Sequence, residues 1–169
     1  YEEVNYEGYG PGGVALLVQA ATDNRNRTVA EIRKIFERAG GHLSELNSVA
    51  WMFKQAGHFL IDAHSIGEDD LLLVALDAGA ADVGADDGMY EVTTTTTKFA
   101  GVREAFDNNG IKCEHAELAM LPASYIKLQG SEAKQCLKLM EKLEDHDDVQ
   151  GVYTNADIDP KEFKNAAAG

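Results

Sequence analysis

The sequence contains few cysteines, few basic residues and no long apolar run. Its two cysteines, Cys113 and Cys136, do not form a Cys-x-x-Cys motif, which predicts two free thiols in a reducing compartment. A membrane-spanning helix needs about 20 consecutive apolar residues, and no stretch of the chain approaches this length. A signal-peptide pattern is also missing. These absences favour the cytoplasm, or the matrix of an organelle if the organism is a eukaryote.

Motifs for catalysis and metal binding are missing as well. The five histidines show no His-Glu-x-x-His or other metal-ligand spacing, and no Gly-x-Ser-x-Gly is present. Cys113 and His115 would share one strand face, but zinc normally takes three or four ligands, so an ordinary thiol and a surface histidine are the simpler interpretation. Residues 145–148 lack the glycine and the distal glutamate of an EF-hand, which favours an acidic loop after a helix. We therefore expect no enzyme activity, cofactor, metal or small-molecule substrate.

Positive charge is scarce and unevenly distributed. The chain has 15 basic and 29 acidic residues, giving a formal charge of −14. Residues 1–60 carry six basic and seven acidic residues, a net charge of −1, which leaves nine basic against 22 acidic residues, or −13, in the remainder. The first part holds a local basic cluster with Arg25, Arg27, Arg33 and Lys34. We expect a polyanion to bind there if it binds anywhere; an ordinary solvated helix face is the alternative.

Glycine is abundant near the N-terminus. The glycines of this stretch are Gly8, Gly10, Gly12 and Gly13. Their spacing fits Gly-x-Gly-x-x-Gly, but a dinucleotide-binding loop follows a strand and opens a helix. Here the glycines precede an apolar run over residues 13–21, which predicts a buried strand. We interpret the stretch as a loop, serving either as a structural hinge or, together with Tyr9, as a backbone surface that meets a large partner.

A turn and a helix follow the predicted strand. Residues 23–26 favour a turn, because Asp and Asn side chains bond to their own backbone. Thr28 and Glu31 have the spacing of a capping box, so we expect the helix to begin there and to end at Gly40-Gly41. The turn carries Asn24, Arg25, Asn26 and Arg27. Free backbone amides at a helix N-terminus attract anions, so this turn is a candidate phosphate site.

The next segments alternate between strand and helix patterns. Residues 48–53 and 58–62 predict two strands joined as a hairpin, and Asp-Asp-Gly at residues 86–88 predicts the turn of a second hairpin. Trp51 is interpreted as a core or inter-domain anchor; a platform for stacking bases is the alternative. These patterns predict mainly antiparallel sheets with helices on one face.

Together, the elements predict an α+β fold with two ferredoxin-like (split βαβ) domains, the second inserted into the first. The last helix begins near Ser131, with Ala133, Leu137, Met140 and Leu143 as its inward side chains. The predicted parts are residues 1–62 plus 123–157 for the first domain, residues 63–122 for the inserted domain, and residues 158–169 for a tail. A serial arrangement of the two domains is the alternative.

Several long motifs resemble the YebC/PmpR family. They are residues 6–15 (Tyr-Glu-Gly-Tyr-Gly-Pro-Gly-Gly-Val-Ala), 22–28 (Thr-Asp-Asn-Arg-Asn-Arg-Thr), 40–41, 48–53, 75–80 and 143–155. The resemblance extends over almost the whole chain. The family includes bacterial proteins described as transcriptional regulators and a mitochondrial translational activator of cytochrome c oxidase subunit I.

The resemblance implies three domains, a helical lysine-rich one followed by two α+β domains. Because the chain begins at Tyr1 and not at methionine, we expect a fragment that lacks the helical domain. The resemblance also implies no enzyme activity, and action either on promoter DNA or on the ribosome, including relief of stalling. The heavily acidic middle of the chain and the Thr93–Thr97 run look specific to this chain.

We favour the ribosome and its RNA as the partner, because a glycine loop and an arginine turn suit recognition of shape and backbone. No base-reading helix-turn-helix pattern is visible, so a DNA-binding transcriptional regulator is the alternative. A small-molecule sensor is a third hypothesis that rests on fold analogy alone. The predicted nucleic-acid-binding residues are Gly8, Tyr9, Gly10, Gly12, Gly13, Asn24, Arg25, Asn26, Arg27, Arg33 and Lys34.

Overall fold

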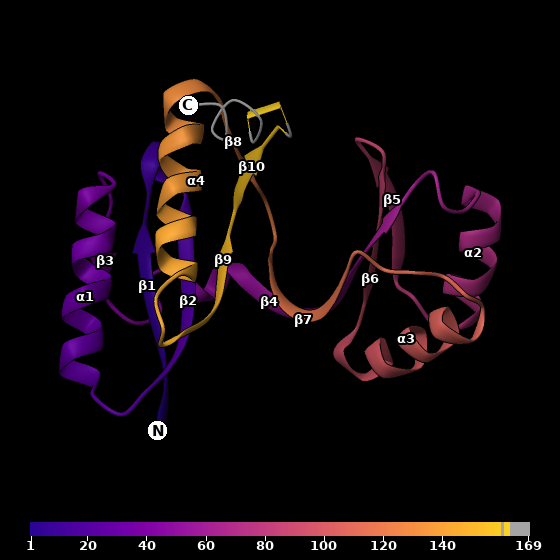
Figure 1. The fold of residues 1–169 in the computed structure, drawn as a ribbon, viewed down its shortest axis with the longest axis horizontal. Helices are drawn as coiled ribbons and strands as arrows, with labels where there is room; N and C mark the ends of the chain where they lie inside the picture. Colours follow the sequence, from indigo (N-terminus) through magenta and orange to yellow (C-terminus); the bar gives the residue numbers. More distant parts are fainter. Residues whose placement is uncertain (160, 163–169) are drawn as a thin grey trace. The chain divides into compact units, whose positions relative to one another are not determined.

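The chain forms two compact α+β units in a computed structural model that describes residues 1–159, 161 and 162 (Figure 1). Unit 1 consists of residues 1–54 together with the chain from Leu121 onward, and unit 2 consists of residues 55–120. The unit boundaries therefore lie at residues 54/55 and 120/121, whereas the sequence analysis placed them at 62/63 and 122/123. Most of the predicted tail, residues 158–169, falls outside the described residues.

Unit 1 contains a four-stranded antiparallel sheet in the order β3-β1-β2-β9. Its elements are β1 (Glu2–Tyr9), the 3-10 turn η1 (Pro11–Gly13), β2 (Ala15–Thr22), α1 (Arg25–Arg38), β3 (His42–Ser44), η2 (Ala50–Met52), β8 (Ile126–Leu128), α4 (Gly130–Glu144), β9 (Val149–Thr154) and β10 (Ala156–Ile158). Strands β2 and β3 flank β1, and α1 joins them, which makes a split βαβ motif. β8 and β10 form a separate parallel pair.

The first strand, β1, corrects the prediction of a loop over residues 6–13. Gly8 lies inside β1, opposite Leu16 of β2. A Cβ atom on Gly8 would lie 2.7 Å from both Phe36 Cε1 and the His42 carbonyl oxygen, closer than carbon atoms approach in packed proteins. Gly8 therefore allows α1 and β3 to pack closely against β1. Within residues 6–13, Gly12 and Gly13 alone, with φ of 71° and 81°, supply the left-handed backbone of a tight turn.

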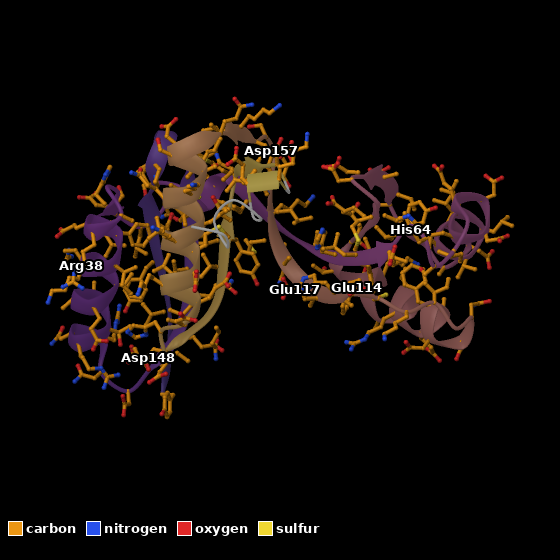
Figure 2. The ribbon with its side chains drawn as sticks, turned by 45° about the horizontal axis from the view of Figure 1, so that its top comes forward. Arg38, His64, Glu114, Glu117, Asp148 and Asp157 are labelled. Atoms are coloured by element: carbon orange, nitrogen blue, oxygen red, sulfur yellow. The ribbon has the colours of Figure 1, made fainter. Side chains whose placement is uncertain are left out.

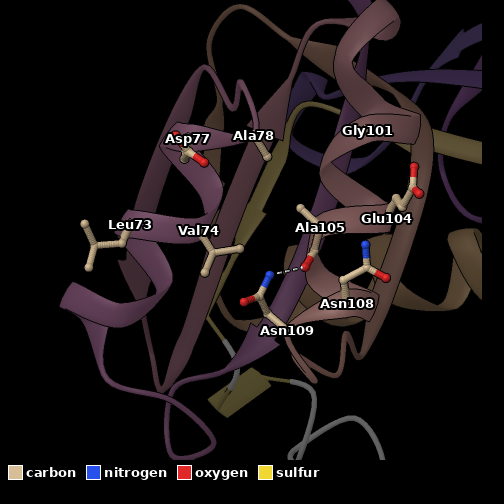
Figure 3. Close-up of a pocket in the computed structure, with 9 residues that line it drawn as sticks. All are labelled: Leu73, Val74, Asp77, Ala78, Gly101, Glu104, Ala105, Asn108 and Asn109. Atoms are coloured by element: carbon tan, nitrogen blue, oxygen red, sulfur yellow. Dashed lines mark hydrogen bonds between the residues drawn. The ribbon is translucent and has the colours of Figure 1, made fainter.

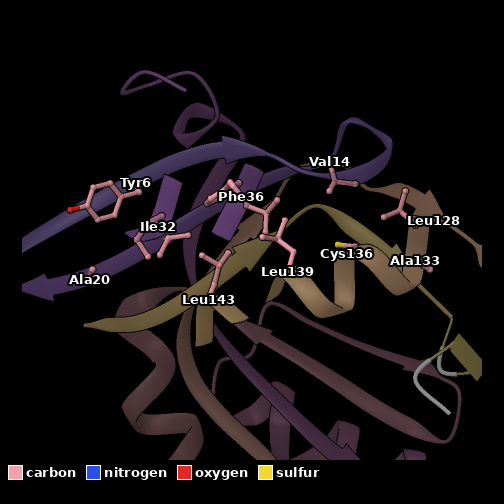
Figure 4. Close-up of a cluster of buried hydrophobic side chains, with 12 residues drawn as sticks. Tyr6, Val14, Ala20, Ile32, Phe36, Leu128, Ala133, Cys136, Leu139 and Leu143 are labelled. Carbon is pink, nitrogen blue, oxygen red and sulfur yellow. The ribbon is translucent and has the colours of Figure 1, made fainter. Parts of the chain in front are cut away.

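Helices α1 and α4 lie side by side against one face of the unit 1 sheet (Figures 1 and 4). Ile32 and Phe36 of α1 are fully buried there, as are Cys136 and Leu139 of α4. Of the four side chains predicted inward on α4, Ala133 and Leu143 are buried, whereas Leu137 and Met140 are only partly buried. The buried stripe of the helix runs through Ala133, Cys136, Leu139 and Leu143. Burial raises the pKa of the Cys136 thiol to about 11, so this thiol is un-ionised at neutral pH.

The segment between β3 and β4 is bound to β1 through the side chain of Glu7. Glu7 of β1 is 3% exposed. Its carboxylate accepts hydrogen bonds from the backbone amides of Asn47, Val49 and Ala50 at 2.7, 3.0 and 2.6 Å. One acidic side chain therefore fixes the path of this irregular segment by satisfying amides that no strand partner reaches.

The hairpin predicted over residues 48–62 is wrong. Residues 50–52 form η2, and the following residues form a single strand, β4 (Phe53–Asp62). Trp51 is 74% exposed, and its indole N–H donates to the Ser48 carbonyl oxygen at 3.0 Å. The prediction of Trp51 as a core anchor is therefore wrong, since its ring lies largely in solvent.

Unit 2 is a ferredoxin-like sandwich in chain order β-α-β-β-α-β. Its elements are β4, α2 (Glu68–Asp77), β5 (Asp82–Asp86), β6 (Met89–Thr94), the 3-10 turn η3 (Thr96–Lys98), α3 (Phe99–Asn108) and β7 (His115–Pro122). The sheet order β5-β6-β4-β7 separates the two strands of each βαβ motif by one strand. The hairpin turn predicted at residues 86–88 is confirmed by the β5–β6 pairing.

The core of unit 2 is separate from that of unit 1. Its centre holds Phe59 of β4, Leu71 of α2, and Val102 and Phe106 of α3, all at most 1% exposed. The Phe59 and Phe106 rings meet edge to face, with centroids 5.2 Å apart, the geometry that aromatic pairs favour. Unit 1 has the strand order and orientations of the same sandwich, with β1 in the position that β6 occupies in unit 2.

Candidate nucleic-acid interface

The arginine-rich segment forms the first turn of α1. Asn24 is the N-cap, and its side-chain oxygen accepts from the Arg27 backbone amide at 3.1 Å. The predicted capping box of Thr28 and Glu31 is therefore wrong: Thr28 lies inside the helix and is fully buried. Arg25, Asn26 and Arg27 follow the cap, so they project from the helix and not from a preceding turn.

Arg27 is surrounded by carboxylates. Its guanidinium lies 2.9 Å from Asp148, 3.4 Å from Glu31 and 3.6 Å from Asp23, and its side chain is 47% exposed. The hydrogen bond to Asp148 raises the pKa of Arg27, with smaller coulombic contributions from the three acids. The cation is reachable from solvent, but neighbouring carboxylates offset its charge, which weakens it as a contact for a polyanion.

Asp148, in the turn after α4, joins the start of α1 to the start of β9 (Figure 2). Its carboxylate accepts from the Thr28 hydroxyl at 2.8 Å and from Arg27 at 2.9 Å. Those hydrogen bonds, the one from Thr28 first, lower the pKa of Asp148. The backbone amide of Asp148 donates to His146 Nδ1 at 3.1 Å, and Nε2 of the same ring lies 2.7 Å from Glu31.

This arrangement predicts acid-sensitive packing of the α1 N-terminus. Because the folded-state pKa of Asp148 is lowered, its stabilising effect is complete above the ordinary aspartate pKa of about 3.9 and is lost as the pH falls through the lower folded value. Asp148→Asn should therefore reduce stability at pH 7 and lose less on acidification than the unaltered protein. Urea unfolding at a series of pH values measures the difference. Asp147→Asn, at a neighbouring exposed residue, is the control; equal effects of both substitutions would contradict the prediction.

Arg25 and Arg33 line a second feature, a groove of about 730 Å³ beside β1, β3 and the segment after β3. Arg25 is 64% exposed and has one described ionic partner, Glu2, at 3.4 Å. Arg33 and Lys34 are exposed on α1. The groove also contains Tyr6, whose buried hydroxyl has no hydrogen-bond partner among the described residues. Arg25 is therefore less neutralised than Arg27.

The glycine residues lie at the other end of the unit 1 sheet. The η1 turn precedes β2, whereas the arginines follow it, and eight residues of strand extend over roughly 23 Å. Gly10 is buried, and its amide donates to the Val14 carbonyl oxygen at 2.8 Å. A Cβ atom on Gly12 would lie 2.5 Å from Leu128 Cδ2. The structure thus separates the predicted site into two groups, with Gly8, Tyr9, Gly10, Gly12 and Gly13 in one and the α1 residues in the other.

Two grooves that the sequence analysis missed lie between helices. A groove of about 390 Å³ between α1 and α4 carries Arg38, Lys138 and Lys142. The lysine spacing of four residues in α4 was the available signal, because such residues share one helix face. A groove of about 570 Å³ between α2 and α3 carries Asp77 and Glu104, and its acidity does not suit a polyanion (Figure 3).

The described residues show neither a metal site nor a membrane span. Over residues 1–159, 161 and 162, no group of three or more His, Cys, Asp or Glu side chains is placed to hold a metal ion. Within the same range, every helix is too short or too polar to cross a bilayer.

These features define a two-unit α+β protein with basic residues concentrated on α1 and α4. The family model described as the TACO1/YebC second and third domain matches residues 1–156. The chain belongs to the TACO1/YebC family.

Relatives and a solved structure agree with this assignment. The chain is 49% identical over 162 residues to a protein of Natranaerobius thermophilus, and 50% identical over 159 residues to one of Dictyoglomus turgidum; each is named a probable transcriptional regulatory protein. Each match includes 94% of this chain and 65% or 64% of the relative, so the chain spans slightly less than two thirds of their length. A conserved hypothetical protein from Aquifex aeolicus has a crystal structure with a TM-score of 0.81 at 37% identity, covering 94% of this chain and 65% of that one. The predicted family and α+β fold class are both confirmed.

Proposed function

We propose that this protein is a non-enzymatic regulator of gene expression that acts on the ribosome, in the cytoplasm or an organelle matrix, by binding RNA. The observation that carries the proposal is the pair of exposed arginines, Arg25 and Arg33, beside a groove at the edge of the unit 1 sheet. Exposed guanidinium groups bind phosphate oxygens, and such contacts position a protein on RNA without reading its sequence. The relief of stalled translation is the activity proposed for this interaction.

The charge distribution supports unit 1 as the RNA-facing part. Helices α1 and α4 together carry eight basic and five acidic residues, a net charge of +3. Helices α2 and α3 together carry one basic and six acidic residues, a net charge of −5. Since the phosphate backbone attracts cations over several ångströms, the helix layer of unit 1 is the more favourable surface.

Replacing both Arg25 and Arg33 by glutamine in the full-length protein should reduce the fraction that co-sediments with ribosomes. Each lost phosphate contact should reduce the salt slope of binding by about one unit. Arg103→Gln with Lys112→Gln removes the same charge from exposed positions of unit 2 and should leave sedimentation unchanged. Equal sedimentation of the Arg25/Arg33 variant and the unaltered protein over a range of salt concentrations would refute the role of this pair.

A DNA-binding transcriptional regulator is the second candidate, favoured by the names of the bacterial relatives. It predicts preferential retention of promoter DNA over scrambled DNA of equal length at moderate salt. Crosslinking in cells separates the candidates, because ribosomal RNA should be recovered with a translation factor and promoter DNA with a transcription factor. Equal retention of scrambled DNA would dismiss the second candidate.

A further inference from the structure

The groove between α1 and α4 has three cations at its rim, and none of them has an ionic partner within the part of the chain that the structure describes. Arg38 comes from the last turn of α1, and Lys138 and Lys142 are one turn apart on α4. All three side chains are exposed, and no ion pair joins them to a carboxylate of the described residues. They therefore differ from Arg27, whose charge is offset by three acids.

We propose that the α1–α4 groove, with its rim cations Arg38, Lys138 and Lys142, is a binding site for the phosphodiester backbone of RNA. The inference rests on the proposed function and deepens it, because it adds a second contact surface to the same RNA partner. Lys138 and Lys142 are separated by a rise of about 6 Å along the helix, which allows the two ammonium groups to reach neighbouring phosphates of one strand. The groove contains no aromatic side chain for base stacking, so binding there is independent of sequence.

The composition of the groove favours RNA over an acidic protein segment. A partner helix would need an apolar surface to cover, but Leu139 in the floor of the groove is only 1% exposed and Ile35 is partly buried. Lysine side chains generally place their aliphatic parts along an apolar surface and keep their charged groups in solvent. Among the described residues, Arg38, Lys138 and Lys142 are the only charged side chains that line the groove, and no acidic side chain lies among them.

The groove beside β1 and β3 and the groove between α1 and α4 lie on different sides of α1. Ile35, Arg38 and Ala39 of α1 face α4, whereas Arg25, Val29 and Arg33 line the groove beside β1 and β3. A strand of RNA that contacts both grooves must pass over α1, where Lys34 is exposed.

The test measures the salt dependence of RNA binding in the natural-length protein. The variant Arg38→Gln, Lys138→Gln, Lys142→Gln is compared with the control Lys98→Gln, Arg103→Gln, Lys112→Gln, which removes one arginine and two lysines from exposed positions of unit 2. The probes are a mixed-sequence single-stranded RNA of fixed length and its duplex. The groove variant should bind roughly tenfold or more weakly at low salt, and its salt slope should fall by about three units, one for each lost contact. The control should match the unaltered protein.

A charge-retaining variant distinguishes the loss of positive charge from a loss of the fold as the cause of weaker binding. Arg38→Lys, Lys138→Arg, Lys142→Arg should restore binding, and thermal unfolding of each variant checks that the fold is intact. An unchanged salt slope in the glutamine variant would overturn the inference while leaving the proposed function in place. Absence of salt-dependent RNA binding by the unaltered protein would overturn both. If a polyglutamate peptide binds through these residues and RNA does not, the groove serves an acidic protein and the inference is wrong.

Discussion

Glu7→Ala is expected to destabilise unit 1 by about 3 kcal/mol or more, because it leaves three backbone amides without their acceptor. Glu7 is 3% exposed, and its carboxylate binds the amides of Asn47, Val49 and Ala50. Hydrogen bonds to a charged acceptor are worth more than neutral ones, and unpaired buried donors are costly. Urea unfolding followed by circular dichroism measures the loss, and amide hydrogen exchange locates it in the segment between β3 and β4.

Two further substitutions show whether the carboxylate causes the effect. Glu7→Gln keeps one oxygen acceptor and should fall between the alanine variant and the unaltered protein. Glu3→Ala removes an exposed glutamate from the same face of the same strand and should change stability by less than about 0.5 kcal/mol. If Glu7→Ala were no more destabilising than Glu3→Ala, the carboxylate would not be fixing this segment.

Phe36→Ala should cost unit 1 about 3–5 kcal/mol, the usual range for truncating a buried phenylalanine. Phe36 is fully buried between α1 and the sheet, where its ring packs over Gly8. The free-energy loss combines reduced burial of apolar surface with the cavity that the missing ring leaves. Denaturant unfolding gives the total, and hydrogen exchange shows where protection is lost.

Phe106→Ala is the matched variant in unit 2, because Phe106 is 1% exposed in the other core. Since the two cores share no residues, each substitution should accelerate hydrogen exchange in its own unit and leave the other protected. If either variant loses protection in both units, the two units unfold together.

Gly8→Ala should reduce the stability of unit 1 less in the Phe36→Ala background than in the unaltered protein, because the ring that meets the added methyl group is gone.

The elements that local patterns predicted correctly are those whose signals lie within a few residues. The Asp86-Asp87-Gly88 turn and the apolar run that became β2 needed no distant information. β1 was missed because Gly8 was interpreted, together with the glycines that follow the strand, as part of a loop. Yet Val4 and Tyr6 alternate with polar residues, which is the signal of a half-buried strand. The glycine at position 8 serves close packing with a helix, and only the structure reveals this.

The candidate site is less predictable, because its contacts join distant parts of the chain. Arg27 and Asp148 are 121 residues apart in sequence and 2.9 Å apart in space. The sequence analysis identified the basic cluster but not the acids that neutralise Arg27, and it missed the groove that brings Arg38 of α1 near Lys138 of α4. Whether an arginine can bind a partner depends on whether a carboxylate already neutralises it. These ion pairs join residues far apart in the sequence, so the spacing of nearby residues does not predict them.

The pairing of β2 with β9 has a consequence for how the chain is made. Leu16 pairs with Thr154, so the apolar β2 strand has an unprotected edge until some 130 further residues have been translated. At typical synthesis rates this takes on the order of ten seconds. Unit 2 is complete in sequence by then, so we expect it to fold while β2 still lacks its β9 partner. An open apolar edge of this kind is where another chain pairs wrongly, so β9, which is translated after the whole of unit 2, is the strand that protects the edge of β2.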